Sequence, residues 1–502
     1  MNHWIVAPVV LPAILAAIMT LSMRHHPGLQ RVFSVAGCVA LLAIALCLTV
    51  QAAGGGIGVY ELGNWPAPFG IVLVLDRLSA VMLLVTAVLA LVVLLYAIGT
   101  DWDQRGRNFH ALWQFQLMGI CGAFLTGDAF NLFVFFEVLL IASYGLMIHA
   151  GGGRRLKAGV QYVIYNLLGS TLFLFALGTL YAVTGTLNMA DLAVRAAEIP
   201  VGDGALLRVG AMLLFLVFAI KAALLPLHFW LPNTYAEAPA PVAALFAIMT
   251  KIGAYAILRF YTLIFGPDLD VTADLIDEVL LWGALLTLAA GMIGILGARR
   301  LGRLAAFASI GSMGTLLIAV AVFTPQSSAA ALYYAIHSTL GAALLFLVVD
   351  LVRERRGALA GALVPGPRMA QHGMLTALWF GAAIAVAGLP PLSGFVGKLL
   401  ILDATRDMAD VWLIWGAVLA TSLVAVLGFA QAGSVVFWKV DARAPVAQAP
   451  PQRALPLVAT FGLLAGIVAL AVFAGPVMRY LEATAAQLHA PAGYIAAVLG
   501  QG

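Results

Sequence analysis

The sequence is poor in charged residues. Asp, Glu, Lys and Arg make up only 10% of its 502 residues, whereas 63% are hydrophobic, and the mean hydropathy is +1.04. Soluble globular domains carry about 25% charged residues, so this composition excludes that class. The formal net charge is only +4, and we expect no nucleic-acid partner.

Cysteine is scarce as well. The chain has three cysteines, Cys38, Cys47 and Cys121, all in apolar runs and without paired spacing. This pattern excludes a disulfide framework and does not support an iron–sulfur or zinc site. No glycine-rich phosphate-binding loop stands out either. We therefore expect no cofactor, no metal site and no enzyme activity, so any work must draw on ion gradients or on partner subunits.

Long apolar runs fill the sequence instead. A helix needs about 20 apolar residues to cross the hydrocarbon core of a bilayer. Runs of this length predict an all-α polytopic membrane protein with about fourteen transmembrane helices. The expected spans are 3–22, 32–50, 77–98, 111–126, 129–149, 160–184, 207–231, 238–262, 274–297, 303–323, 329–350, 373–402, 410–437 and 455–478.

Basic residues are distributed unevenly between the two sets of alternate loops. One set holds Arg24, Arg31, Arg105, Arg107, Arg154, Arg155, Lys157, Arg299, Arg300, Arg303, Arg353, Arg355, Arg356, Arg368, Lys439, Arg443 and Arg453. The opposite side of the membrane has Arg77, Arg195, Arg208, Arg259, Arg406 and Arg479. Because short basic loops stay in the cytoplasm, we expect both termini on the non-cytoplasmic side of a bacterial cytoplasmic (inner) membrane.

Two predicted spans, the seventh and the twelfth, are interrupted. The seventh contains Pro226 and Pro232, and the twelfth contains Gly388, Pro390 and Pro391. Gly/Pro-interrupted helices at corresponding positions of two halves are typical of inverted-repeat transporters. We expect a single transmembrane domain over 1–502. Its first inverted repeat covers about 111–262, its second about 274–437, and flanking helices occupy about 3–98 and 455–478. Proline kinks that only improve packing are the alternative for either break.

Five ionisable residues lie within predicted spans. They are Glu137, Lys221, Lys251, His337 and Lys398. A charged side chain at the bilayer centre costs at least about 2.5–3.5 kcal/mol on insertion scales, so such residues usually serve transport. Burial disfavours their charged forms and a nearby opposite charge favours them, which suits a proton path. Glu137 and Lys221 might instead form a structural ion pair, and His337 a hydrogen bond between helices.

Three stretches carry a resemblance to a known family. FNLFVFFEVLLIASYGLM (130–147), FAIKAALLPLHFWLPNTYAEAPAPVAALFAIMTKIGAYAILRF (218–260) and GLPPLSGFVGKLLIL (388–402) resemble the antiporter-like membrane subunits of respiratory complex I and of Mrp-type cation/proton antiporters. Within that superfamily, ELGNWPAPFGIVLVLDRLSA (61–80) and IHSTL (336–340) are similar to the D subunit of the Mrp (Mnh, Pha) sodium or potassium/proton antiporter.

The resemblance implies roles for individual residues. Glu137 matches the glutamate that pairs with the lysine of the seventh helix, which Lys221 matches. Lys251 matches the central lysine of the eighth helix, and Lys398 the charged residue of the broken twelfth helix. The largest complex I relative has a lysine shortly after the histidine of the eleventh span, whereas residues 338–342 read STLGA here. Either His337 or water therefore connects Lys251 with Lys398.

Three functions are consistent with these observations. The first is the proton-translocating subunit of a multisubunit sodium or potassium/proton antiporter, with other subunits, protons, the cation and membrane lipid as partners. The second is a proton-pumping subunit of a complex I-like oxidoreductase or a membrane-bound hydrogenase. The third is a scaffold that does not transport, which the complete set of ionisable residues disfavours. No cluster of carboxylates indicates a sodium site, so we expect the cation path at an interface with a partner.

Overall fold

A computed structural model describes residues 3–267, 269–440 and 453–500. The chain is almost entirely helical. Its α-helices are α1 (Ala7–Leu21), α2 (Pro27–Ala53), α3 (Arg77–Gly99), α4 (Phe109–Leu125), α5 (Ala129–Met147), α6 (Gly153–Thr184), α7 (Met189–Ala197), α8 (Ala205–Lys221), α9 (Trp230–Glu237), α10 (Ala240–Leu263), α11 (Asp277–Gly297), α12 (Leu301–Val320), α13 (Pro325–Arg355), α14 (His372–Ala387), α15 (Ser393–Ala404), α16 (Val411–Gly433), α17 (Ala454–Val472), α18 (Ala474–Leu488) and α19 (Pro491–Leu499). Arg443, one of the basic loop residues, lies outside the described residues.

The helices have the length and apolarity of a polytopic membrane protein. Ten helices of the described residues are long and apolar enough to cross a membrane, and α1, α4 and α14 are shorter apolar helices. This confirms the predicted all-α membrane fold. The predicted span 373–402 contains two helices, α14 and α15. Within the predicted span 207–231, α8 ends at Lys221 and α9 begins only at Trp230.

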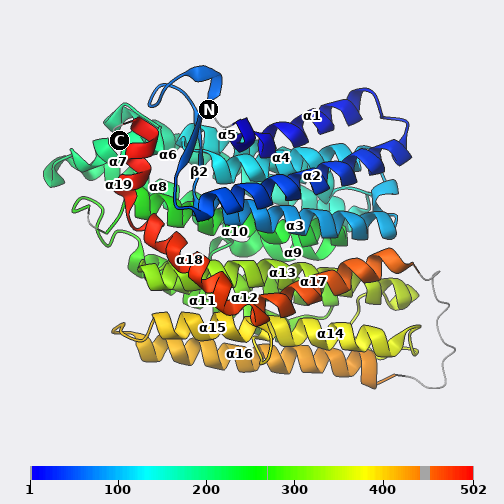
Figure 1. Ribbon diagram of the computed structural model, residues 1–502. Helices are drawn as coiled ribbons and strands as arrows, with labels where there is room; N and C mark the ends of the chain where they lie inside the picture. Colours follow the sequence, from blue (N-terminus) through cyan, green and yellow to red (C-terminus); the bar gives the residue numbers. More distant parts are fainter. Residues whose placement is uncertain (1–2, 268, 441–452, 501–502) are drawn as a thin grey trace.

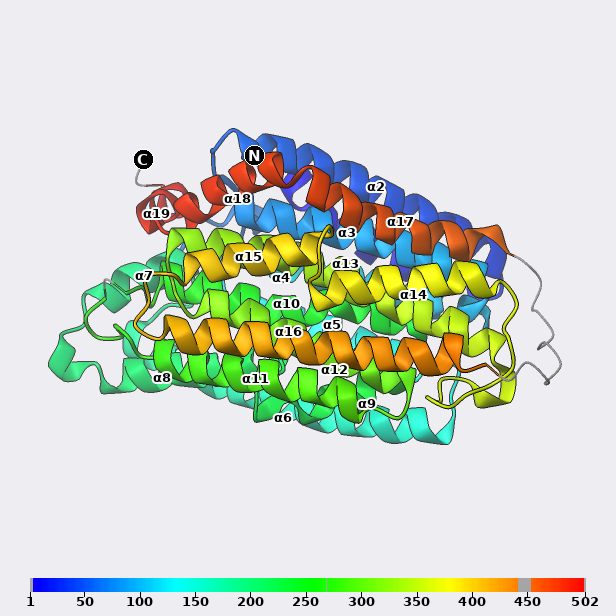
Figure 2. The ribbon, with the colours of Figure 1, turned by 90° about the horizontal axis from the view of Figure 1, so that it is seen from below.

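The bundle buries its central helices and exposes its outer ones. The helices run roughly side by side, with α1 and α16 at opposite edges of one view and α2 and α6 at opposite edges of the other (Figures 1 and 2). Every residue of α10 is buried. In contrast, α6 and α16 expose large apolar side chains, such as Leu167 at 60% and Leu419 at 57%. Exposed apolar side chains of this size suit contact with lipid.

Several elements were not predicted. A hairpin of β1 (Gly58–Glu61) and β2 (Val72–Leu75) pairs antiparallel, with Gly58 opposite Leu75. Short helices α7 and α19 also lie outside the predicted spans, and α18 begins within the last predicted span, 455–478, and extends beyond it. The hairpin, α7 and α19 gather at the end of the bundle where both chain termini lie (Figure 1). These short or amphipathic segments lack the long apolar run on which the span prediction rests.

Arg259, which falls within the predicted span 238–262, has a partner that the sequence analysis did not predict. It lies within α10, only 4% exposed, and its guanidinium is 2.6 Å from the carboxylate of Asp76. Asp76 also caps α3, accepting a hydrogen bond from the backbone N–H of Ser79 at 2.8 Å. Arg259 is therefore one half of a buried ion pair between α10 and the start of α3.

Candidate functional site

The chain leaves the α-helical conformation directly after Lys221, and side chains satisfy the backbone there. The indole N–H of Trp230 donates to the carbonyl of Ile220 at 3.0 Å. The N–H of Leu225 donates to the hydroxyl of Thr287 on α11 at 2.8 Å. A backbone group left unpaired at membrane depth would cost several kcal/mol, so these two contacts stabilise the interruption between α8 and α9.

Lys221 is the last residue of α8 and lies against α6. Its side chain is buried, and its Nζ donates to the amide oxygen of Asn166 at 3.1 Å. The amide group of Asn166 in turn donates to the carbonyl of Tyr162 at 2.8 Å. The ammonium also lies 5.8 Å from the ring centre of Phe136 on α5. Lys221 is thus held by neutral groups from two helices.

Glu137 lies on α5 and is only partly buried. Its carboxylate accepts a short hydrogen bond from the hydroxyl of Ser170 on α6. Among the described residues, no ion pair joins Glu137 to Lys221. Ser170 and Asn166 are four residues apart and so share one face of α6. The structure therefore connects Glu137 and Lys221 through α6 rather than by the direct pair that the resemblance implied.

Lys251 lies in the middle of α10, the most deeply buried helix of the bundle. The residue is 1% exposed, and its Nζ has no hydrogen-bond partner among the described residues. An isolated ammonium in a dry interior is expensive, and water satisfies buried polar groups when the site is polar and roomy enough. The surroundings of Lys251 therefore suit an amine that carries its proton only part of the time.

His337 lies on α13 and contacts the start of α15. Its Nδ1 is 2.8 Å from the hydroxyl of Ser393. The neighbouring Gly394 allows the close approach, because a Cβ atom there would lie 2.8 Å from Nε2 of His337 and 2.0 Å from the carbonyl oxygen of Ala385. Glycine at 394 thus lets α14, α15 and His337 meet.

Lys398 uses the interruption between α14 and α15. Its Nζ donates to the carbonyl of Ala387, the last residue of α14, and to the hydroxyl of Ser422 on α16, both at 2.8 Å. Gly388 follows with a φ of 78°, and a Cβ there would lie 2.7 Å from Cδ of Lys398. The break therefore both frees a carbonyl and makes room for the lysine that binds it.

The predicted site residues fall into two groups. Glu137 and Lys221 lie around α6, whereas His337 and Lys398 lie around α15, and Lys251 stands on α10, which contacts both α8 and α13. The sequence analysis missed the polar partners Asn166, Ser170, Ser393 and Ser422. Single small polar residues are common in membrane helices, and only the spacing of Asn166 and Ser170 was a usable signal.

Comparison with known proteins places the chain in a family. The profile of the family described as "NADH:quinone oxidoreductase/Mrp antiporter, TM" matches residues 126–425, which include all five predicted site residues. The chain belongs to this family. This membership confirms the superfamily to which the motifs pointed.

Members of the family resemble the chain along its whole length. The probable K(+)/H(+) antiporter D subunit of Rhizobium meliloti is 38% identical over 98% of this chain and 96% of its own length. The Na(+)/H(+) antiporter D subunit of Bacillus subtilis is 37% identical over 99% and 100%. Among solved structures, a chain of the Mrp complex from Dietzia sp. superposes with a TM-score of 0.89 at 27% identity, covering 100% of both chains.

Proposed function

We propose that this chain is the proton-translocating D subunit of a multisubunit sodium or potassium/proton antiporter in a bacterial cytoplasmic membrane. It is a secondary transporter subunit, not an enzyme. Two relatives with this subunit name match the chain over nearly its whole length. The similarity to a chain of a solved Mrp complex supports an assembly with other subunits.

One observation carries the proposal: three lysines and a histidine lie inside the bundle, each at most 6% exposed. They are Lys221, Lys251, His337 and Lys398, on α8, α10, α13 and α15. Among their described contacts, none has a carboxylate within ion-pair distance. Ionisable residues kept in a membrane interior at such cost mark proton relays.

The contacts suggest how protons move. A proton enters at Glu137, and the carboxylate stabilises the ammonium of Lys221 when the two approach. When they separate, as in this structure, Lys221 is held only by neutral groups and releases its proton toward Lys251. His337, with Ser393 and water, passes the proton on to Lys398. Lys398 then releases it from the interruption beside Ser422.

The membrane arrangement is part of the proposal. We infer fourteen crossings, with α8 and α9 as one interrupted crossing and α14 and α15 as another. Both termini face away from the cytoplasm, because the basic loops gather at the opposite end. The two interruptions, each with a lysine beside it, support inverted repeats over 111–262 and 274–437.

Cation-driven proton movement in inverted vesicles tests the proposal. The complete complex is expressed in an antiporter-deficient host, and proton release is followed after addition of sodium or potassium. Lys221→Ala is expected to abolish the response while the complex still assembles. Lys157→Ala, which removes an exposed lysine in the first turns of α6, is the matched control and is expected to transport normally.

Two results would contradict the proposal. Full transport by Lys221→Ala would remove Lys221 from the path and favour a scaffold. Absence of any response in the unaltered complex would favour the redox-driven pump, since the family description also includes NADH:quinone oxidoreductases. Electron-transfer subunits encoded beside this chain would then be expected.

A further inference from the structure

A pocket of about 420 Å³ lies where the chain turns from α1 into α2 and from α3 into α4. It belongs to the end of the bundle that carries the basic loops and is remote from the proton path. Its charged and titratable lining residues are Arg24, His25, Asp103, Arg105, Arg107 and His110. The positive-inside rule accounts for arginines in these loops, but not for their convergence around one depression.

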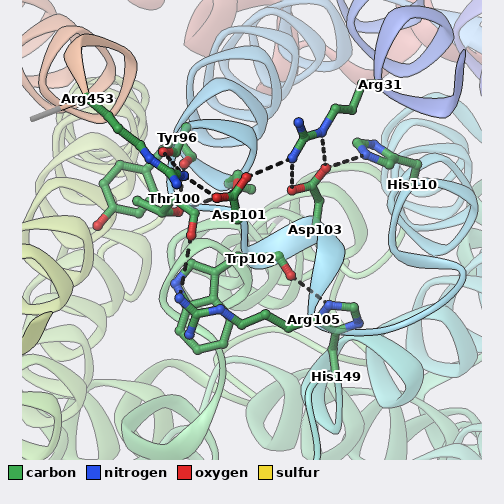
Figure 3. A network of polar contacts seen from close by, with 12 residues as sticks. Arg31, Tyr96, Thr100, Asp101, Trp102, Asp103, Arg105, His110, His149 and Arg453 are labelled. Carbon is green, nitrogen blue, oxygen red and sulfur yellow. Dashed lines mark hydrogen bonds and ion pairs between the residues drawn. The ribbon is translucent and has the colours of Figure 1, made fainter. Parts of the chain in front are cut away.

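The acidic residue of the pocket cannot neutralise these arginines. Arg31 binds both carboxylate oxygens of Asp103, at 2.6 and 2.9 Å, and also reaches Asp101 at 3.1 Å. Nε2 of His110 approaches Asp103 at 3.1 Å from the other side. Figure 3 shows this arrangement, with Asp103 enclosed between Arg31 and His110. The charge of Asp103 is therefore already matched within the fold.

The remaining basic groups are available to a ligand. Arg24 and Arg107 are exposed and have no ion pair or side-chain hydrogen bond among the described residues. The guanidinium of Arg105 lies 3.8 Å from the ring centre of Trp102 and donates to the carbonyl of Thr100 at 3.4 Å, which leaves its other N–H groups for a ligand. His110 is only 2% exposed, and its Nδ1 lacks a partner within the described part of the chain. The pocket is thus lined by three guanidinium groups, of which those of Arg24 and Arg107 have no partner among the described residues, and by the buried His110.

The surroundings favour a lipid as the source of the anion. Directly beside the pocket, α1 ends and α2 begins with large apolar side chains exposed: Leu21 at 83%, Leu29 at 48% and Val32 at 63%. In Figure 2, α2 lies at the outer edge of the bundle. A ligand bound here would therefore have its acidic group over the arginines and its hydrocarbon portion along α2.

We propose that this pocket binds the phosphate head group of an anionic phospholipid. The three arginines hold the phosphate, since guanidinium groups recognise phosphate through paired N–H donors. The acyl chains lie on the exposed apolar faces of α1 and α2. Such a lipid anchors the two peripheral helices to the α3–α4 turn.

Photolabelling of the complete complex tests this site. The complex is reconstituted in phosphatidylcholine bilayers containing a phosphatidylglycerol with a photoactivatable head group. Labelled peptides are then identified by mass spectrometry.

We expect the photolabel in residues 21–31 and 101–110. Arg24→Gln, Arg105→Gln and Arg107→Gln combined should weaken labelling by about tenfold or more, because each basic residue near the surface contributes to anionic-lipid binding. The matched control combines Arg154→Gln, Arg299→Gln and Arg368→Gln, which removes three exposed arginines of other basic loops and should leave labelling unchanged.

Competition for the photolabel on the unaltered complex distinguishes a lipid phosphate from a soluble phosphate as the ligand, and it requires no variant. Unlabelled phosphatidylglycerol should displace the probe, whereas phosphatidylcholine and inorganic phosphate should not. Displacement by inorganic phosphate would identify a site for soluble anions and overturn the lipid proposal. Equal labelling by a phosphatidylcholine probe would overturn it as well. So would crosslinks from residues 21–31 to another subunit, because the pocket would then be a protein interface.

Discussion

At the residue scale, the buried cations differ in what holds them. An amide oxygen accepts from Lys221, and a main-chain carbonyl and a hydroxyl accept from Lys398. Lys251 has no partner among the described residues. Neutral acceptors can serve both a charged and a neutral amine, whereas a fixed carboxylate would strongly favour the charged form. These contacts therefore suit lysines that gain and lose protons.

Removing the amide beside Lys221 should slow transport. Asn166→Ala deletes the acceptor at 3.1 Å. A hydrogen bond to a charged group contributes about 1.5–3 kcal/mol, so we expect a loss of about tenfold or more in rate with assembly intact. Cation-driven proton movement in inverted vesicles measures it. Thr171→Ala, on the exposed face of the same helix, is the control. An unchanged rate in Asn166→Ala would show that this amide does not position Lys221.

The polar network around Asp103 should make stability depend on pH. Burial raises the pKa of Asp103, but hydrogen bonds with His110 and Arg31 outweigh this effect and lower it overall. A carboxyl whose pKa is lowered by folding stabilises the fold above its unfolded pKa, about 3.9 for Asp, and loses this effect as the pH falls through the folded value.

Asp103→Asn should therefore lower the stability of the detergent-solubilised chain at neutral pH, by about 1.5–3 kcal/mol. The difference from the unaltered protein should shrink below about pH 4. Thermal unfolding at a series of pH values measures it, with the exposed Asp203→Asn as control. A difference that is the same at acidic and neutral pH would contradict this account.

At the element scale, the interruption between α14 and α15 depends on small residues. Gly394 lies where α15 meets both Ala385 of α14 and His337 of α13. Proline and glycine in the sequence predicted an interruption here, but not which neighbours would enter it. The close packing of three helices at Gly394 couples the position of α15 to that of His337.

Gly394→Ala should disturb this junction and slow transport. The added Cβ would lie 2.0 Å from the carbonyl oxygen of Ala385, so backbone must move. A displacement of about 1 Å can reduce a rate about 100-fold, and we expect transport to fall by this order. Gly416→Ala on α16, where a Cβ would meet nothing within 4 Å, is the control. The cation-driven proton transport rates of both variants are measured in vesicles and normalised to the amount of assembled complex. Equal rates would show that α15 tolerates the shift.

At the scale of the whole molecule, distant segments are joined by the buried pair of Asp76 and Arg259. Arg259 also lies beneath the ring of Tyr494 on α19, 5.2 Å from its centre. The pair therefore connects the N-terminal helices with the central helix α10 and with the last helix of the described chain. Because it is buried, it should matter more for stability than the exposed ion pairs.

Breaking this pair on one side should destabilise the fold. Arg259→Gln leaves Asp76 buried without its partner, and such changes cost about 3–5 kcal/mol. Combining it with Asp76→Asn should cost less than the sum of the two single changes, since neither charge is then stranded. The free energies of unfolding in detergent of the unaltered protein, the two single variants and the double variant measure this difference. Arg195→Gln removes the ion pairs of the exposed Arg195 with Asp191 and Glu198 and should cost no more than about 1 kcal/mol. Strict additivity of the two buried changes would mean that they do not interact.

Much of the architecture could be predicted because it depends on local features. The apolar runs correspond to helices, and the family comparison confirms the resemblance of the 130–147, 218–260 and 388–402 stretches. The hairpin, α7, α18 and α19 could not be predicted in this way, since none is a long apolar run. The pairing of Arg259 with Asp76 could not be predicted, because a basic residue near a helix end looks the same in sequence whether it faces a loop or a buried carboxylate.

The sequence by itself determined that the chain is a helical membrane protein and which ionisable residues lie within its spans. The length of an apolar run, and the presence of an ionisable residue within it, are properties of contiguous residues. Both can therefore be recognised without knowledge of the tertiary structure. Only the tertiary structure decided the partners of those residues: Asn166 and Ser170 between Glu137 and Lys221, Ser393 beside His337, and Ser422 on Lys398. These contacts join residues on different helices, 24 to 56 positions apart in the chain, and their geometry follows from packing rather than from any local pattern.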